Sequence, residues 1–205
     1  MLDISDPHWS TWPACIAVKA AGLQGAAVAE RYLRRLRRAA LTERIQVQRE
    51  EAQLALAHDV RGLDLAAFRA DLGGPRAAAA FRDDLATCRS YGVSGFPTML
   101  FQPAGTEPDR RARPILVNGY RPLESLERVL ASVAPGLVKH EARPTEELLA
   151  EYGPLTEAEL SVITSSPLPE LPRTLDTAAG RGRIARRDLR GGTLWELAEA
   201  PAVTA

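Results

Sequence analysis

Residues 92–101, with the sequence Gly-Val-Ser-Gly-Phe-Pro-Thr-Met-Leu-Phe, constrain the fold more than any other stretch of this chain. Within them a helix ends, a Gly-x-Pro loop turns the chain, and an apolar strand begins. Gly92 supplies the left-handed turn that commonly ends a helix, and Pro97 makes a cis peptide bond accessible. A cis bond there would turn the neighbouring backbone groups toward an extended partner chain. The pattern predicts a substrate-facing loop, with an ordinary connecting loop as the alternative.

Regular elements flank this loop on both sides. A helix is predicted over residues 76–91, with an apolar stripe that includes Cys88. A second apolar run at 115–118 predicts another strand, and leucines at three- and four-residue spacing predict a helix over 123–133. The order is therefore helix, loop, strand, loop, strand and helix.

This order resembles the DsbA-type thioredoxin-fold disulfide oxidoreductases, in particular their cytosolic FrnE-like branch. The matching segments are residues 12–21, 23–25, 62–64 with Phe68, the cis-proline loop at 92–98, Gly119-Tyr120, and the helix over 123–133. The resemblance implies an α/β, thioredoxin-like domain over residues 1–138, with a helical insertion at 13–91 and the thioredoxin part at 92–138. It also implies oxidoreductase activity, without a cofactor, on a disulfide- or thiol-containing protein or small molecule. The substrate would bind at Ser94, Gly95, Phe96, Pro97 and Thr98.

A departure from the family pattern concerns the redox motif. Family members begin with a strand and a Cys-x-x-Cys motif at a helix N-terminus, followed by another strand, before the helical insertion. Here the two cysteines lie 73 positions apart. The reaction needs a thiolate that attacks a substrate disulfide and a second thiol close by that resolves the mixed disulfide. We therefore expect an N-terminally truncated member with impaired or absent catalysis. The alternative is a non-catalytic adaptor that holds protein partners through the cis-proline loop.

Cys15 is the better candidate for any remaining thiol chemistry. It follows Pro13, which is favoured in a first helical turn, where unpaired amides stabilise a thiolate. A packing role is the alternative, because cysteine is among the most buried residue types. Cys88 shares the apolar stripe of its helix and is expected in the core. A disulfide between the two stays open, since the sequence does not fix their separation.

Composition argues against nucleic-acid binding, membrane association and metal binding as general functions of this chain. The chain of 205 residues has 26 basic and 26 acidic side chains, so no global field attracts nucleic acid or a membrane. Asp3 and Asp6 stand where a leader would carry basic residues, and no apolar run approaches the roughly 18 residues of a membrane span. We expect a cytoplasmic location. The three histidines lack metal-ligand spacing, so no metal site is predicted.

Arginines are concentrated in a helix predicted over residues 26–40. They are Arg31, Arg34, Arg35, Arg37 and Arg38. Apolar positions such as Val28, Tyr32 and Leu36 predict the core face of this helix. The arginines are interpreted as a solvated face, with binding of a partner or nucleic acid as the alternative.

A second module follows a linker near residues 135–144. A short helix is predicted over 145–152, and a capping box at Thr156 opens the next one. A third helix ends at Gly180, and Gly191-Gly192 between two apolar runs predicts a hairpin. This order resembles a small winged-helix module.

The module is placed at residues 145–197, with a flexible tail at 198–205 and Trp195 in the core. Three arginines near the hairpin are candidates for nucleic-acid contact: Arg183, Arg186 and Arg187. Prolines before the third helix shorten the segment that would enter a DNA groove. DNA binding is therefore the second alternative, behind packing or protein contact.

The strand at 98–101 has one evident neighbour in the sequence, the strand at 115–118. A two-stranded hairpin is marginally stable alone, and an open apolar strand edge recruits other strands. We expect a homodimer through this edge, or pairing of the edge with residues 2–4.

Overall fold

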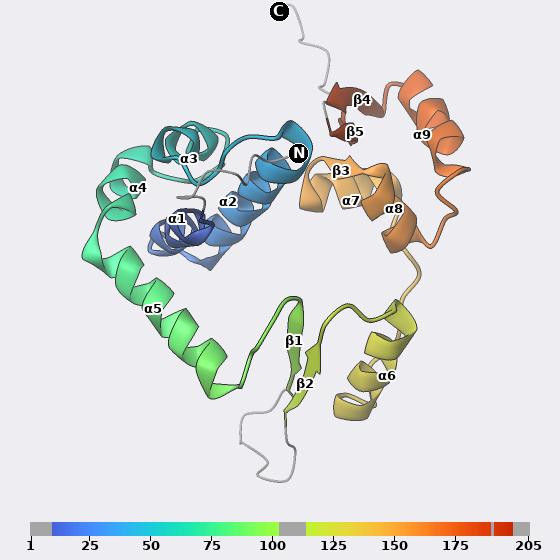
Figure 1. Cartoon of the computed structure of the whole chain (residues 1–205). Coiled ribbons are helices and arrows are strands. Elements are labelled where there is room, and N and C mark those ends of the chain that lie inside the picture. The colour runs from blue at the N-terminus through green and yellow to red at the C-terminus, as the bar shows by residue number, and fades with distance from the viewer. Residues whose placement is uncertain (1–9, 103–113, 190, 199–205) are drawn as a thin grey trace, which may run out of the picture. The chain divides into compact units, whose positions relative to one another are not determined.

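The computed structural model describes residues 10–102, 114–189 and 191–198. The chain divides into two compact units (Figure 1). One unit combines Met1–Ala77 with Glu141–Ala205, and the other is Ala78–His140. The first unit therefore joins two segments that are far apart in the sequence.

The first segment of this unit is helical. It contains α1 (Trp12–Gly22), α2 (Ala26–Arg38), η1 (Ala39–Glu43), α3 (Glu50–Ala57), α4 (Leu65–Leu72) and the start of α5 (Pro75–Ser90). Local signals explain where helices begin. Pro13 stands in the first turn of α1. The Asp64 carboxylate caps α4 by accepting hydrogen bonds from the N–H groups of Ala66 and Ala67 at 2.8 and 3.0 Å.

Two aromatic rings lie at the centre of the helical core. Tyr32 of α2 and Phe68 of α4 are fully buried, and their ring centroids lie 5.0 Å apart at an interplanar angle of 51°. The Tyr32 hydroxyl donates to the Gln53 carbonyl at 3.2 Å, so this buried polar group is satisfied. Burial raises the pKa of Tyr32 far above its ordinary value. The hydroxyl therefore stays protonated and acts as a structural donor.

The end of α2 differs from the helix predicted over residues 26–40. The α-helix ends at Arg38, and the chain continues to Glu43 as the wider π-helical segment η1. The Thr42 hydroxyl donates to the Arg38 carbonyl at 2.8 Å and so competes with the regular backbone pattern. The segment ends at Arg44, whose φ of 58° is left-handed.

The second segment of the first unit mixes helices and strands. Its order is α7 (Thr145–Tyr152), β3 (Leu155–Thr156), α8 (Glu157–Thr164), α9 (Leu171–Gly180), β4 (Ile184–Leu189) and β5 (Gly192–Leu197). The strands form an antiparallel sheet in the order β3-β5-β4. The predicted helices and the Gly-Gly hairpin are therefore confirmed.

Trp195 is the central core residue of this segment, as predicted. It is fully buried on the middle strand β5 and packs with buried leucines that include Leu160 and Leu175. The predicted capping box also forms at α8. The Thr156 N–H donates to the Glu159 carboxylate at 2.8 Å, and the Glu159 N–H donates to the Thr156 hydroxyl oxygen at 3.2 Å.

Gly191, in the turn between β4 and β5, contacts the π-helical segment. Its N–H donates to the Thr42 carbonyl at 3.1 Å. A Cβ at this position would lie 2.8 Å from the Thr42 carbonyl oxygen and 3.0 Å from that of Leu41. Glycine is required here because the two backbones approach too closely for a side chain.

Replacing Gly191 with alanine is expected to lower the free energy of unfolding by about 1–3 kcal/mol, the usual cost of overpacking. The atoms that the new Cβ meets belong to the backbone, so they cannot move aside as the end of a side chain would. Urea denaturation measures the difference. Gly180→Ala is the matched control, because nothing lies within 4 Å of a Cβ there. An equal loss in both variants would contradict the role assigned to Gly191.

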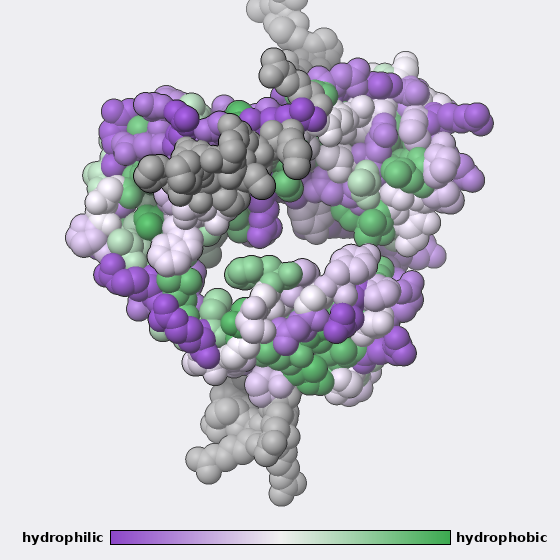
Figure 2. All heavy atoms as spheres, viewed as in Figure 1, coloured by the Kyte–Doolittle hydropathy of each residue, from purple (hydrophilic) through white to green (hydrophobic). Residues whose placement is uncertain are grey.

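The second unit contains most of α5, a two-stranded hairpin and α6 (Leu123–Val133). The strands β1 (Thr98–Phe101) and β2 (Ile115–Asn118) pair antiparallel, from Thr98 opposite Asn118 to Phe101 opposite Ile115. Both strands and α6 match the predicted segments. All residues of β1 are half-buried, and none of α6 is fully buried. Figure 2 shows apolar residues at the surface over β1, β2 and α6.

The outer edge of β1 has no strand beside it within the described ranges. Residues 2–4, the expected alternative partner of this edge, lie outside those ranges. Association of two copies through β1 therefore stays a prediction.

Candidate functional site

The cis-proline loop connects α5 to β1. The peptide bond between Phe96 and Pro97 is cis, as predicted. Gly92 ends α5 with the expected left-handed φ of 70°, and the Val93 N–H donates to the Cys88 carbonyl at 2.9 Å. The glycine thus directs the chain out of the helix and into the loop.

Hydrogen bonds hold the loop against the end of the hairpin. The Gly119 N–H donates to the Pro97 carbonyl at 2.8 Å. The Thr98 hydroxyl donates to the Gly95 carbonyl at 2.6 Å and lies 3.0 Å from Oδ1 of Asn118. The loop therefore has a fixed backbone, although Ser94, Gly95, Phe96 and Pro97 are all exposed.

Two aromatic side chains project from this fixed backbone. Phe96 is 91% exposed and Tyr120 is 82% exposed. They belong to the two segments that the Gly119 to Pro97 hydrogen bond joins. Sequence reasoning treated Tyr120 as part of a turn and missed it as a site residue. The sequence does contain a signal for Tyr120, because an aromatic residue directly follows the turn glycine Gly119. Exposed aromatic rings on a rigid support are typical of protein-contact sites.

The cysteines do not form a dithiol pair within either unit. Cys15 is exposed on α1 of the first unit, and its N–H donates to the Thr11 carbonyl at 3.0 Å. Its exposure contradicts the packing alternative. Cys88 is half-buried on α5 in the second unit. Within residues 10–102, 114–189 and 191–198, no three His, Cys, Asp or Glu side chains gather as metal ligands would.

We predict that the 205-residue chain does not reduce insulin disulfides at the rate of a dithiol enzyme. An exposed Cys15 can form a mixed disulfide, but resolution needs a second thiol close by. Turbidity of insulin in the presence of dithiothreitol measures the turnover, with Cys15→Ser as the matched variant. Turnover above background that Cys15→Ser abolishes would show that Cys15 has a resolving partner.

The three arginines considered for nucleic-acid contact each face a carboxylate of their own segment. Arg183 lies 3.4 Å from Glu146, and Arg187 lies 3.2 Å from Glu196. Arg186 lies 3.1 Å from Asp188, and this hydrogen bond raises the pKa of Arg186. All three side chains are exposed. Their positive charge is offset locally, which weakens the attraction that a phosphate backbone would need.

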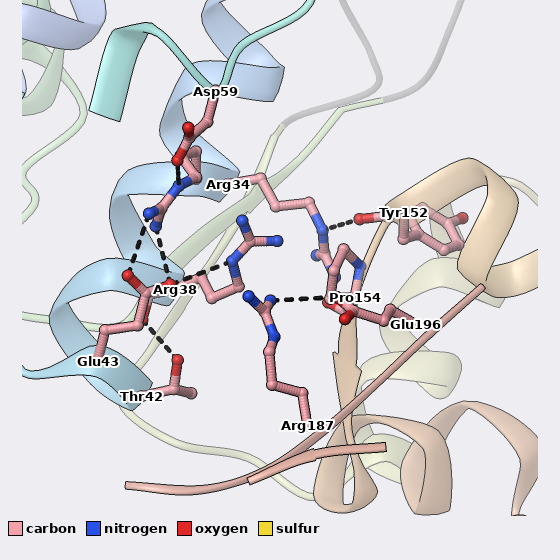
Figure 3. A network of polar contacts seen from close by, with 10 residues as sticks. Arg34, Arg38, Thr42, Glu43, Asp59, Tyr152, Pro154, Arg187 and Glu196 are labelled. Atoms are coloured by element: carbon pink, nitrogen blue, oxygen red, sulfur yellow. Dashed lines mark hydrogen bonds and ion pairs between the residues drawn. The ribbon is translucent and has the colours of Figure 1, made fainter. Parts of the chain in front are cut away.

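Some arginines of α2 are packed against other residues of the unit, which corrects their interpretation as a solvated face. Arg31 and Arg37 are exposed, whereas Arg34, Arg35 and Arg38 are half-buried. Figure 3 shows Arg34 and Arg38 of α2 directed toward the C-terminal segment of the same unit. Their partners lie more than a hundred positions away or beyond the regular helix, so helical periodicity could not reveal them.

Arg35 has the strongest ion pairs of this group. Its two terminal nitrogens donate to the two Glu43 oxygens, both at 3.0 Å, and its Nε donates to Asp59 at 2.7 Å. A bidentate pair of this kind is geometrically specific. It fixes η1 against α2 and the loop after α3.

A sequence model of the thioredoxin family matches residues 2–128, which is more than half of the chain. The chain therefore belongs to the thioredoxin family, and its mixed α/β structure contains a thioredoxin-like domain. The family resemblance is confirmed at this level. No helix within the described residues is long and apolar enough to cross a membrane.

Individual relatives share a more specific name. The chain is 30% identical to the ClpXP adapter protein SpxH of Shouchella clausii, over 95% of this chain and 63% of that protein. It is 26% identical to the ClpXP adapter protein SpxH of Halalkalibacterium halodurans, over 96% of this chain and 63% of the relative. The Bacillus subtilis protein of the same name is 24% identical over 93% of this chain and 62% of its own length. The chain thus spans less than two thirds of these relatives.

Proposed function

We propose that this chain is a ClpXP adapter that binds a protein partner through the cis-proline loop. The similarity to proteins named ClpXP adapter, which extends over nearly the whole chain, carries the proposal. The loop supplies the binding chemistry, because Phe96 and Tyr120 are exposed on a backbone that hydrogen bonds hold in place. An adapter function thus replaces oxidoreductase catalysis as the principal function proposed for this chain.

The proposed contact uses the loop as a peptide-facing surface. Ser94, Gly95, Phe96 and Pro97 are exposed beside Thr98, the first residue of β1. A partner segment would pack against the aromatic rings and extend along this exposed backbone. Pre-ordering lowers the entropic cost of binding, since the loop does not have to become ordered on contact. Within this proposal the chain is a DsbA- and FrnE-like thioredoxin fold that has kept the contact loop.

We assign residues 145–197 to a winged-helix-like module within this architecture, and residues 1–138 to the thioredoxin-like domain. The order of elements and the β3-β5-β4 sheet support the first assignment. The paired arginines favour a protein contact over DNA for this module. The tail expected at 198–205 lies outside the described residues except for its first position.

Direct binding to ClpXP tests the proposal. The purified chain is immobilised through its C-terminus, and purified ClpXP from the same cell flows over it with ATP. We expect saturable binding that persists in the Cys15→Ser, Cys88→Ser double variant, because no thiol chemistry is involved. Absence of binding, or binding that requires the cysteines, would contradict an adapter function.

A further inference from the structure

A pocket of about 560 Å³ lies between α2 and the C-terminal segment of the first unit. Its walls are largely apolar and include Leu33, Leu41 and Leu194, with Tyr152 beside them. Arg37 and Arg38 bring positive charge to the same pocket. The volume is in the range of small-ligand sites, which bury apolar groups and fix them with a few polar contacts.

Arg34 holds one wall of this pocket in place (Figure 3). Its Nε donates to the Tyr152 carbonyl, and its Nη2 donates to the Pro154 carbonyl at 3.2 Å. The guanidinium also lies over the Tyr152 ring, 5.8 Å from the centroid. Arg34 therefore uses its donors within the protein and has a supporting role. The other two arginines of the pocket, Arg37 and Arg38, are the ones positioned to contact a ligand.

One donor of Arg38, its buried Nε, has no hydrogen-bond partner among the described residues. The Glu43 carboxylate is occupied by the bidentate pair with Arg35. Arg38 Nε lies 3.5 Å from the same carboxylate, and within the described residues this buried atom has no hydrogen-bond acceptor. Burial and the nearby Arg35 lower the pKa of Arg38. Arg38 thus shares the single Glu43 carboxylate with Arg35, and its half-buried charge is only partly compensated, so an incoming anion would add a second counter-charge.

The charges of the pocket lining indicate what kind of anion fits. Three arginines, Arg34, Arg37 and Arg38, stand against two glutamates, Glu30 and Glu159, which leaves one net positive charge. Arg37 is exposed, and the structure shows no ion pair for it among the described residues. A single carboxylate would neutralise this one net positive charge. A phosphate with a double negative charge would exceed it and would be repelled by the two glutamates.

We propose that this pocket binds a peptide segment that carries one carboxylate beside an apolar side chain. The carboxylate accepts hydrogen bonds from Arg38 and Arg37, and the apolar side chain packs against Leu33, Leu41 and Leu194. Such a segment is either a protein C-terminus or an acidic residue next to an apolar one. The inference rests on the proposed function, because an adapter has protein partners, and it adds a second contact site in the first unit.

Three rhodamine-labelled hexapeptides test the pocket by fluorescence anisotropy with the full 205-residue chain. One ends in Ser-Leu-Leu with a free carboxylate, the second is its C-terminal amide, and the third is an amide that ends in Glu-Leu-Leu. We expect at least one acidic peptide to bind about tenfold tighter than the neutral amide, as charged hydrogen bonds allow. The tighter acidic peptide identifies which source of carboxylate the site prefers. Equal binding of all three, or no binding at millimolar concentration, would overturn the proposal.

Two variants locate the binding. Arg38→Gln should weaken the acidic peptide about tenfold by removing the charged donor. Leu41→Asp should do the same without unfolding the chain, because Leu41 is 73% exposed. Leu137→Asp is the matched control, at an exposed leucine outside the pocket. Unchanged affinity in Leu41→Asp, or an equal loss in Leu137→Asp, would show that the peptide binds elsewhere.

The outcome for the pocket is separable from that for the adapter function. ClpXP binding and peptide binding are both measured with the unaltered 205-residue chain. Peptide binding without ClpXP binding would overturn the adapter proposal alone. ClpXP binding without peptide discrimination would overturn the pocket alone.

Discussion

Phe96→Asp is expected to reduce partner binding at the cis-proline loop by at least tenfold and to leave stability unchanged. The ring is 91% exposed, so the fold gains almost nothing from it. A central aromatic anchor contributes about 2 kcal/mol or more to a protein interface, and a charge in its place would have to be desolvated on contact. A photo-crosslinking amino acid at Ser94 measures the loss as a decrease in crosslinked partner.

Two matched variants show whether this effect belongs to the loop. Phe96→Tyr keeps an aromatic ring and should retain most of the crosslinking. Val162→Asp places the same charge at another exposed apolar position, on α8, and should have no effect. Crosslinking that survives Phe96→Asp would remove the loop from the binding surface. Loss in Val162→Asp as well would indicate a general effect of surface charge.

Trp195→Ala is expected to destabilise the first unit by about 3–5 kcal/mol, the range for truncating a buried aromatic residue. Trp195 is fully buried on the middle strand, between Leu155 and Arg186 on the neighbouring strands. Its indole N–H also donates to the Glu157 carboxylate at 3.2 Å. Urea denaturation measures the free energy of unfolding.

Trp195→Phe is the control for this second variant. It keeps most of the buried ring and loses the hydrogen bond, so its cost should be smaller than that of alanine. A loss below about 1 kcal/mol for Trp195→Ala, a typical value for an average substitution, would contradict its central place in the core.

Features that depend on neighbouring residues could be predicted from the sequence. The capping box needs Thr156 and Glu159 three positions apart, and the hairpin needs Gly191-Gly192 between apolar runs. The cis bond before Pro97 followed from a family motif in its expected order. Local spacing determines such features, and tertiary contacts do not override them here.

Features that depend on distant backbone atoms could not be predicted. Arg34 donates to carbonyls of Tyr152 and Pro154, which the sequence separates from it by more than a hundred positions. Gly191 is required by the backbone at Thr42. A side-chain pattern carries no signal for either contact, because the acceptors are main-chain oxygens that every residue type provides.

The same limit explains what was missed at the candidate site. The loop residues 94–98 were identified by motif, whereas Tyr120 joins them through the Gly119 to Pro97 hydrogen bond across the hairpin. The pocket around Arg38 needs two segments that come together in the folded unit. Sequence order alone could not place either group.

Reconstituted degradation tests the central claim most directly. The partner crosslinked at Ser94 is purified and incubated with ClpXP and ATP, with and without the 205-residue chain, and its half-life is measured. An adapter should shorten that half-life, Phe96→Asp should remove the effect, and Cys15→Ser should preserve it. The same half-life with and without the chain would contradict the account.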